Sequence, residues 1–386
     1  MMLENENVPK IRFKWFTKPW DRRKLGELCK ITTGKLDANA MTSDGKYDFY
    51  TSGIDVFKID VAAFEGPAIT IAGNGASVGY MHLADGKFNA YQRTYVLTKF
   101  FADRQFLNVA IGNELPDKIQ EEVRGSGIPY IVLNMLTDLA ISLPLQKEQA
   151  AVGQYFTKLD SLITLYKRKY EKLKQIRKSM LEKMFPHEGR NVPEIRFKGF
   201  TEPWERHKLG ELVSIYDGTH QTPEYQNSGI MFLSVENIST LKSNKYISEE
   251  VFKRDYKVYP KNGDILMTRM GDVGNTNVVK TSQKLAFYVS LALLKPNGIN
   301  SYFLNNAMKT SMFQNGLRER TLLTAIPQKI NKDDIGKVDI FITSNAEEQK
   351  QLGNYFQSLD RLIILHEQKY EKLKQIKKSL LKKMFA

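Results

Sequence analysis

Residues 169–185 read KYEKLKQIRKSMLEKMF, and residues 369–385 read KYEKLKQIKKSLLKKMF. Fourteen of the seventeen positions are identical, and the two copies are 200 residues apart. The first copy closes a stretch from Glu148 that contains no proline and a single glycine, Gly153, and Pro186 follows it directly. Because proline stops a helix and glycine weakens one, the pattern predicts that each copy ends a long helix.

The apolar residues upstream of each copy recur at alternating steps of four and three, which is the spacing of a coiled-coil seam. Arg177 and Lys377 interrupt this seam at equivalent places. A helix of about 37 residues would be about 55 Å long. The seam residues are Val152, Phe156, Leu159, Ile163, Tyr166, Tyr170 and Leu173 in the first copy, and Leu352, Phe356, Leu359, Ile363, His366, Tyr370 and Leu373 in the second.

A seam of two residues in seven is narrow, so each helix needs a partner, and the nearest partner is the other copy. We predict an intramolecular antiparallel coiled coil that holds two domains at a fixed distance. The alternative is two separate amphipathic helices, each packed on its own domain. The residues expected to pack helix on helix are Phe156, Leu159, Ile163, Tyr170, Leu173, Phe356, Leu359, Ile363, Tyr370 and Leu373.

A second repeat precedes each variable part of the chain. Residues 8–20 read VPKIRFKWFTKPW and residues 192–204 read VPEIRFKGFTEPW, with ten of thirteen positions identical, and KLGEL follows both. Between these lead-ins and the helices, residues 30–125 and 214–320 show no convincing alignment. The repeating unit is therefore a shared lead-in, a long variable region and a shared basic tail, occurring twice.

Composition excludes several classes of protein. The 386 residues are 42% hydrophobic and 26% charged, which is typical of globular domains. Cys29 is the only cysteine, so an internal disulfide is impossible, and no run of 18 apolar residues or apolar leader exists. We therefore expect a cytoplasmic protein with no membrane contact. Its net charge of +14 favours a polyanionic partner.

Most of the positive charge belongs to the shared tails. Residues 167–185 carry a net +6 and residues 366–385 a net +5 by their Lys, Arg and Glu content. Two interpretations stay open. The cations form a solvated face that suits the C-terminal end of a helix dipole, or they contact phosphates or an acidic partner subunit.

The variable regions have the pattern of mixed α/β domains. Residues 67–72 form an expected buried strand before the glycine-rich loop 73–79, and residues 91–97 are expected to form a strand of alternating apolar and polar residues. Residues 263–269 run similarly into the loop 270–275. We therefore expect the two regions to share one fold. Each closes on an Ile-Pro pair and an Asn, namely Ile128, Pro129 and Asn134 in the first region and Ile326, Pro327 and Asn331 in the second.

Polar residues of these loops can donate to phosphates and base edges, with Arg suited to guanine and Asn or Gln to adenine. A surface Arg is usually only solvated, so we expect about one in three of these candidates to contact DNA. The candidates are Lys35, Asn74, Ser77, Arg93 and Arg124 in the first region, and Thr219, His220, Gln221, Arg269, Arg318 and Arg320 in the second.

Catalytic motifs are missing from the sequence. The glycines of 73–79 have the wrong spacing for a dinucleotide loop, and no phosphate loop follows. The five histidines show no metal-ligand spacing, and Pro116-Asp117 with Glu121 only loosely matches a nuclease carboxylate pair at an expected helix start. We expect a non-enzymatic binding protein with no metal and no cofactor of its own.

This arrangement resembles the specificity subunit of a type I restriction–modification system. The resemblance rests on two diverged regions each followed by a KYEKLKQIRKSMLEKMF-like helix, on the lead-ins VPKIRFKWFTKPW and VPEIRFKGFTEPW with KLGEL, and on the ending 325–331, AIPQKIN. It covers essentially the whole chain. The lead-in is shorter than in members that have a longer N-terminal helical stretch, so how the chain's start packs against its end stays open.

The resemblance implies an α+β fold with two target recognition domains, two long antiparallel coiled-coil helices and a pseudo-two-fold repeat. Each domain would read one half of a bipartite, asymmetric target in double-stranded DNA, and the helices would set the gap. The helices would also bind two modification subunits, which carry the S-adenosylmethionine chemistry, and restriction subunits, which are translocases and nucleases, would complete the complex.

The resemblance and the repeats together divide the chain into six segments. We expect a lead-in (1–19), target recognition domain 1 (20–145), helix 1 (146–186), a linker with the repeated lead-in (187–204), target recognition domain 2 (205–345) and helix 2 (346–386). One alternative is a coiled-coil scaffold whose domains bind proteins. Another is a fused methyltransferase, against which the missing catalytic motifs argue.

Overall fold

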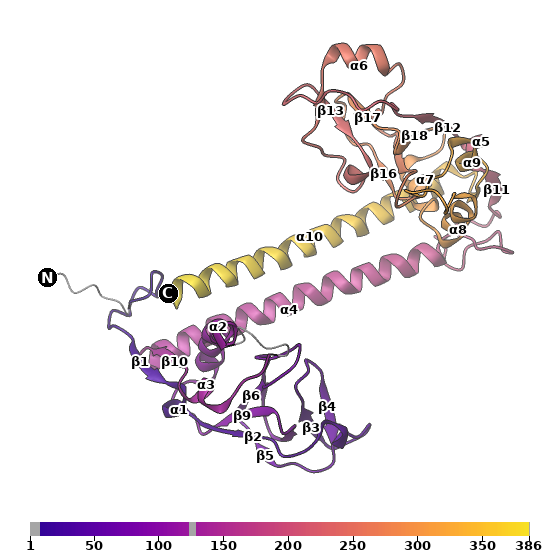
Figure 1. Cartoon of the computed structure of the whole chain (residues 1–386). Coiled ribbons are helices and arrows are strands. Elements are labelled where there is room, and N and C mark those ends of the chain that lie inside the picture. The colour runs from indigo at the N-terminus through magenta and orange to yellow at the C-terminus, as the bar shows by residue number, and fades with distance from the viewer. Residues whose placement is uncertain (1–7, 123–128, 386) are drawn as a thin grey trace. The chain divides into compact units, whose positions relative to one another are not determined.

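The computed structural model describes residues 8–122 and 129–385, which form two compact units. The first unit contains Met1–Lys167 together with Gln368–Ala386, and the second contains Arg168–Glu367. Neither unit is a plain half of the chain, because each one holds a variable domain and a part of both long helices (Figure 1).

The two predicted long helices are present as α4 (Gln146–Lys183) and α10 (Ala346–Met384). Within the first unit, Asp160 of α4 contacts Lys377 of α10, and within the second, Arg177 contacts Asp360. Phe156 also contacts Phe385 in the first unit, and Tyr170 donates to Glu367 in the second. Within each unit the residue number therefore falls along α10 as it rises along α4, so the helices are antiparallel. This confirms the predicted pairing over the alternative of separate helices.

Side chains of the predicted seam enter the hydrophobic cores. In the first unit, Phe156 and Leu159 are buried with Leu373 packed against them. In the second unit, Phe356 and Leu359 are buried with Leu173 packed against them. In each unit, apolar seam residues therefore pack the two helices together, and they also pack both helices against the domain of that unit.

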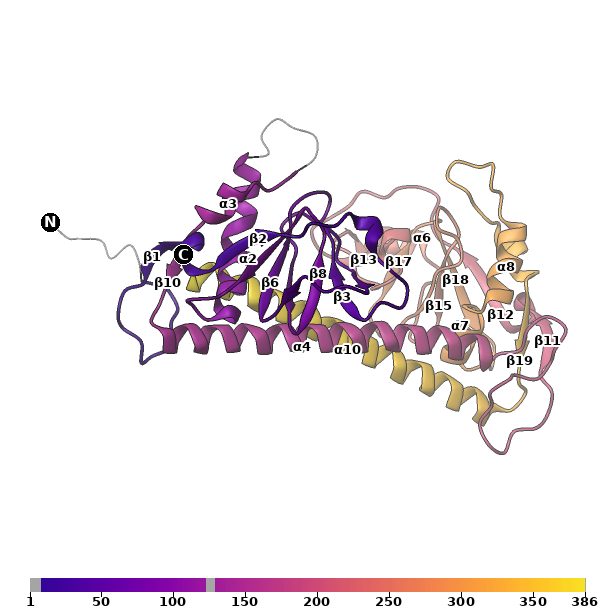
Figure 2. The same cartoon turned by 90° about the horizontal axis from the view of Figure 1, so that it is seen from below.

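The first unit contains three sheets, and Figure 2 labels strands from each of them, namely β2 and β6, β3 and β8, and β1 and β10. The order β2-β9-β6-β7 is antiparallel throughout, the order β4-β3-β8-β5 has a parallel β3–β8 pair, and β1 pairs with β10. The strands are β1 (Asp21–Lys24), β2 (Lys30–Thr33), β3 (Tyr47–Tyr50), β4 (Val56–Ile59), β5 (Phe64–Glu65), β6 (Ala68–Ala72), β7 (Met81–Ala84), β8 (Lys87–Ala90), β9 (Thr94–Thr98) and β10 (Ala140–Leu143).

The second unit repeats this plan. Its sheet β12-β18-β15-β16 is antiparallel, its sheet β14-β13-β17 has a parallel β13–β17 pair, and β11 pairs with β19. Two regions that do not align in sequence therefore share one plan, as predicted, although the second unit's mixed sheet has no counterpart of the edge strand β5. The strands are β11 (Glu205–Lys208), β12 (Val213–Asp217), β13 (Ile230–Leu233), β14 (Tyr246–Ile247), β15 (Ile265–Thr268), β16 (Thr276–Val278), β17 (Leu285–Phe287), β18 (Leu291–Pro296) and β19 (Asp339–Ile342).

Helices complete each domain. In the first unit these are α1 (Leu25–Leu28), α2 (Arg104–Glu122) and α3 (Leu133–Thr137), and in the second α5 (Leu209–Leu212), α6 (Glu249–Asp255), α7 (Ser301–Ala307), α8 (Ser311–Arg320) and α9 (Lys332–Gly336). Two short 3₁₀ turns, Ala38–Ala40 and Val235–Asn237, lie in loops. Helices α2 and α7 both contain Phe-Leu-Asn-x-Ala, at 106–110 and 303–307, a short repeat within the variable regions.

The central strands are buried on both faces. In β6, Ile69 and Ile71 face a core that includes Phe106 of α2, while Ala68 packs with Phe88 of the second sheet. Double burial explains why this strand is continuously apolar rather than alternating. The prediction of an alternating strand over 91–97 was wrong in detail, because β9 begins only at Thr94 and its first four residues are all buried.

Each lead-in joins the start of one long helix to the end of the other. In the first unit the Arg12 guanidinium donates to both oxygens of Glu148, at 2.6 Å each, while the Ile11 amide donates to the Lys383 carbonyl at 3.1 Å. In the second unit Arg196 bonds Glu348 at 2.6 and 2.9 Å. The shared lead-in therefore repeats because its binding partner repeats, and the chain's start packs against its end.

The tryptophan of each lead-in is buried at the same joint. Trp20 makes an edge contact with Phe385, with ring centroids 5.6 Å apart, and Trp204 makes the equivalent contact with Phe185 at 5.5 Å. Both phenylalanines close the basic tail, so the FTxPW and KMF parts of the two repeats meet in the folded unit. Aromatic edge contacts of this kind add to the stability gained by burial.

Candidate nucleic-acid interface

Four of the five predicted contact residues of the first domain gather at one end of one sheet. In the antiparallel order β2-β9-β6-β7, the end of β2, the start of β9, the end of β6 and the start of β7 lie on the same edge. The loops at these four strand ends carry, in chain order, Lys35, Asn74, Ser77 and Arg93. Arg124 lies outside the described residues.

Backbone hydrogen bonds hold this edge together. Gly73 donates to the Arg93 carbonyl at 2.9 Å, and Gly75 donates to the Pro129 carbonyl at 3.2 Å. A Cβ at Gly73 would stand 2.3 Å from the Arg93 oxygen, so this close approach requires glycine. The backbone of the loop 73–79 is therefore held in a defined position at this end of the sheet.

The predicted side chains differ in how free they are. Arg93 and Lys35 are exposed. Asn74 is half-buried, and its Oδ1 accepts a hydrogen bond from the Ser52 hydroxyl at 2.6 Å. Ser52 is thus a neighbour of the loop that the sequence did not single out, because it follows a strand of the other sheet.

The second domain presents the same edge. Thr219, His220 and Gln221 follow the end of β12, and the loop 270–275 follows the end of β15. His220 and Gln221 are exposed, whereas Thr219 is half-buried and its hydroxyl donates to the Gln221 carbonyl at 3.3 Å. The equivalent positions of two unrelated sequences therefore carry different polar groups on one scaffold.

Arg269 points into the domain. Its side chain is 8% exposed, forms an ion pair with Asp217 and donates from Nε to the Ile330 carbonyl at 3.1 Å. A base could reach this guanidinium only after these bonds broke, so Arg269 positions the edge. The sequence could not show this, because Asp217 and Ile330 are distant along the chain.

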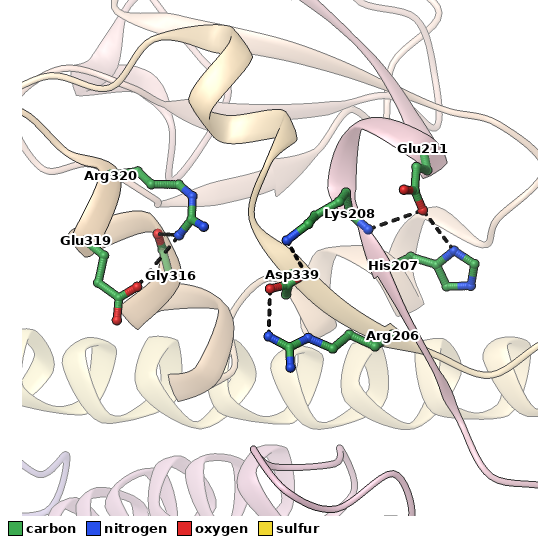
Figure 3. Close-up of polar contacts among 8 residues, drawn as sticks. All are labelled: Arg206, His207, Lys208, Glu211, Gly316, Glu319, Arg320 and Asp339. Carbon is green, nitrogen blue, oxygen red and sulfur yellow. Dashed lines mark hydrogen bonds and ion pairs between the residues drawn. The ribbon is translucent and has the colours of Figure 1, made fainter.

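Arg318 and Arg320 lie in the last turn of α8. Arg318 is exposed, whereas the Arg320 guanidinium turns back to donate to the Gly316 carbonyl at 3.0 Å and lies 3.7 Å from Glu319 (Figure 3). Across a cavity of about 550 Å³, Asp339 binds Arg206 at 2.7 Å. The Arg320 guanidinium is therefore partly occupied by contacts within its own domain.

The segment between α8 and α9 adds an apolar tip to the edge. Ile326 is fully exposed and Leu323 is 63% exposed, while Gly271 donates to the Gln328 carbonyl at 2.9 Å. This places the tip beside the loop 270–275. The sequence analysis singled out the Ile-Pro pair and the stretch 325–331 here, but not the exposed leucines that precede them.

The interruption of the helix seam has a structural reason. Arg177 forms an ion pair with Asp360 and donates to the Asn306 amide oxygen at 3.0 Å. Lys377 donates to Asp160 at 2.6 Å. Because Arg177 and Lys377, like Asp160 and Asp360, are 200 residues apart, the two ion pairs are equivalent under the repeat.

Comparison with known proteins identifies the family. The sequence profile of the family described as type I restriction modification DNA specificity domain matches residues 17–175 and 201–375. The matches cover most of the chain and both repeats, so the chain belongs to this family.

Two curated relatives are similar to parts of the chain. The type I restriction enzyme EcoDI specificity subunit of Escherichia coli is 41% identical over 157 residues, which is 41% of this chain and 34% of the relative. The MjaVIII specificity subunit of Methanocaldococcus jannaschii is 23% identical over 278 residues, which is 68% of this chain and 65% of the relative. The chain therefore matches about one third and just under two thirds of their lengths.

A solved structure supports the fold along the whole chain. The S subunit of a type I restriction–modification system from M. genitalium superimposes with a TM-score of 0.65 at 19% identity, covering 98% of this chain and 99% of that one. A chain from a structural study of type I complex assembly and conformational transition gives 0.50 at 19% identity, covering 96% and 98%. At these identities the likeness establishes architecture only.

The described residues lack both a membrane-spanning helix and a metal-binding cluster. No helix in residues 8–122 and 129–385 is long and apolar enough to cross a membrane. Within the same residues, no group of three or more His, Cys, Asp and Glu side chains is placed to hold a metal ion.

Proposed function

We propose that the chain recognises a DNA sequence as the specificity subunit of a type I restriction–modification complex and catalyses no reaction itself. The observation that carries this proposal is the pair of equivalent sheet edges. One topology occurs twice, and the loops at its edge carry different polar side chains each time. Membership of the specificity domain family supports DNA as the ligand.

Each domain would read one half of an asymmetric, bipartite target. A symmetric dimer reads a palindrome because its two reading surfaces are identical. This chain keeps its lead-ins and helices nearly identical while residues 30–125 and 214–320 have diverged. Such a division suits two unlike half-sites on a common scaffold.

The long helices would set the gap between the half-sites and bind two modification subunits. Leu162 and Leu165 of α4 are 43% and 44% exposed, and Leu362 and Leu365 of α10 are 42% and 43% exposed. These leucines repeat at a spacing of 200 residues, so each unit offers an equivalent apolar pair. Two equivalent surfaces suit two copies of one partner. The S-adenosylmethionine chemistry would belong to that partner, and restriction subunits would complete the complex in the cytoplasm.

Exchange of one variable region tests the reading mechanism. Residues 30–125 would be replaced by the corresponding region of another family member, and methylated adenines in the host genome would be sequenced. We expect one half of the target to change while the other half and the gap persist. A change in both halves would contradict modular reading.

DNA binding by the chain with its modification subunit tests the class of ligand. Specific binding should depend on sequence, and its affinity should fall steeply with salt because cations released from phosphates drive association. Binding that is insensitive to sequence would favour the scaffold alternative.

Docking is tested separately. Leu162→Ala with Leu165→Ala should weaken binding of the modification subunit, whereas Ile54→Ala, in a loop where the side chain is 59% exposed, should not. Equal binding by all variants would show that the apolar pairs do not contribute to binding of the modification subunit.

A further inference from the structure

The second unit contains a polar cavity that is not part of the proposed DNA-reading edge. It has a volume of about 520 Å³ and lies where β16, α7 and residues 354–364 of α10 meet, elements that can be located in Figure 1. Three cations line it, each from a different segment: Lys280 after β16, Lys309 after α7 and Arg361 on α10. Asp360 also lines it, but that carboxylate is neutralised by Arg177.

The three cations have no anionic partner in the described part of the chain. Lys280 lies over the Tyr302 ring, with its Nζ 5.6 Å from the ring centroid. Neither Lys309 nor Arg361 forms an ion pair or a side-chain hydrogen bond with a described residue. Three unpaired cations that line one cavity attract an anion with several acceptor oxygens.

Asn305 gives an independent sign of a missing ligand. The residue is only 7% exposed, yet its Oδ1 accepts no hydrogen bond, and it lines the same cavity. Buried polar groups are rarely left unpaired in folded proteins, so such a group calls for an explanation. A water molecule held between this oxygen and a bound anion would supply the donor, because the anion itself offers only acceptors.

Burial has a marked effect on Lys309. Loss of hydration, together with the nearby Arg177 and Lys280, lowers the pKa of the Lys309 ammonium to about 8, and Asp360 only partly opposes this. At this position of the Phe-Leu-Asn-x-Ala repeat the first unit has Gly112. The desolvated cation therefore belongs to the second domain alone.

We propose that this cavity binds a phosphate group. A tetrahedral phosphate offers oxygens in several directions and so can meet Lys280, Lys309 and Arg361 together, whereas a planar carboxylate offers two oxygens in one plane. If the proposed function holds, the bound phosphate belongs to the DNA backbone. A free phosphate compound is the other source with the same chemistry.

The DNA arm of the test uses the full chain with its modification subunit and compares salt dependence. Lys309→Met removes the half-buried charge while keeping an apolar stem, and Lys350→Met removes an exposed charge from the same helix as Arg361. If the cavity holds a backbone phosphate, Lys309→Met should reduce the slope of log affinity against log salt by about 0.9, and Lys350→Met should leave it unchanged. Arg361→Gln should act like Lys309→Met, and circular dichroism would show that both variants fold.

The second arm titrates inorganic phosphate and pyrophosphate into the full chain and follows the ¹³C signals of methylated lysines. Binding should raise the Lys309 titration midpoint above about 8, because a bound anion stabilises the ammonium against Arg177 and Lys280. A shifted midpoint with an unchanged DNA slope would support the cavity with free phosphate as its ligand.

An unchanged slope with no response to phosphate would overturn the proposal. If the wild-type complex failed to bind DNA, the proposed function would fall, while the titration would still decide whether the cavity binds phosphate.

Discussion

Two buried Arg–Glu pairs join the lead-ins to the long helices, and they stand out among the charged residues. The side chains of Arg12 and Glu148 are 9% and 1% exposed, and those of Arg196 and Glu348 are 11% and 0% exposed. Bidentate pairing satisfies both oxygens of each glutamate, although Nη1 of each arginine is buried with no hydrogen-bond partner among the described residues. Removal of one partner leaves a buried charge unpaired, which is far more costly than loss of a surface pair.

Arg196→Ala should therefore lower the free energy of unfolding by about 3–5 kcal/mol, and Arg12→Ala by a similar amount. Urea unfolding followed by circular dichroism would measure it. Lys253→Ala is the matched control, since its ion pair with Glu249 is exposed on both sides, and it should cost under about 1 kcal/mol. Equal effects in all three variants would show that the lead-in pairs are not structural.

Charged side chains illustrate the limits of reading a sequence locally. Arg269 and Arg93 were equal candidates for DNA contact, yet Arg269 is buried against Asp217 and Arg93 is exposed. Nothing within a few residues of either arginine distinguishes them. The difference arises from a partner 52 residues away in the sequence.

At the scale of elements, close packing of the long helices on their domains depends on two repeated glycines. A Cβ at Gly153 would stand 2.7 Å from the Phe106 amide nitrogen, and at Gly353 it would stand 3.3 Å from the Phe303 nitrogen. Both glycines lie beside the start of the Phe-Leu-Asn-x-Ala segment. They therefore permit each long helix to touch the backbone of α2 or α7.

Gly153→Ala tests this packing. Alanine favours helix by about 1 kcal/mol over glycine, but overpacking against a backbone atom costs about 1–3 kcal/mol, so we expect net destabilisation. Gly112→Ala in α2 is the control, because its Cβ meets only the flexible end of Met81 at 3.1 Å. That variant should be neutral or slightly more stable in thermal unfolding. A stabilised Gly153→Ala would refute the close approach.

The ion pairs in the seam are expected to select the register of the helices. A polar residue at a seam position favours the one alignment that satisfies it. Arg177 and Asp360 are 18% and 43% exposed as side chains, so their coupling should be about 1 kcal/mol.

Arg177→Asp should destabilise the protein, and adding Asp360→Arg should recover part of the loss. A double-mutant cycle from chemical unfolding would measure the coupling. The pair Lys377 and Asp160 provides the equivalent cycle in the first unit. Strictly additive effects would mean that the two charged side chains of a pair do not interact.

At the scale of the whole molecule, the two continuous helices belong to both units. Residues 146–167 of α4 lie in the first unit and 168–183 in the second, and α10 is divided near Glu367. A change in helix length should therefore affect target spacing without affecting either reading edge.

Insertion of one heptad after Lys167 in α4 and one after Lys369 in α10 would lengthen both helices by about 10 Å. Because base pairs are 3.4 Å apart, we expect the gap in the methylated target to grow by about three base pairs with both half-sites unchanged. Genome-wide sequencing of methylated adenines would measure the gap. An unchanged gap would show that the length of the helices does not set the spacing of the two half-sites.

The sequence by itself determined the repeated plan, the two long helices, their antiparallel pairing and the shared domain fold. Helix periodicity, proline stops and repeated segments are local or self-similar signals, so they can be read without coordinates. Only the tertiary structure decided that Arg177 pairs with Asp360, that Arg269 turns inward and that Lys280, Lys309 and Arg361 share one cavity. These groups are far apart in the chain, and long-range packing alone brings their charges together.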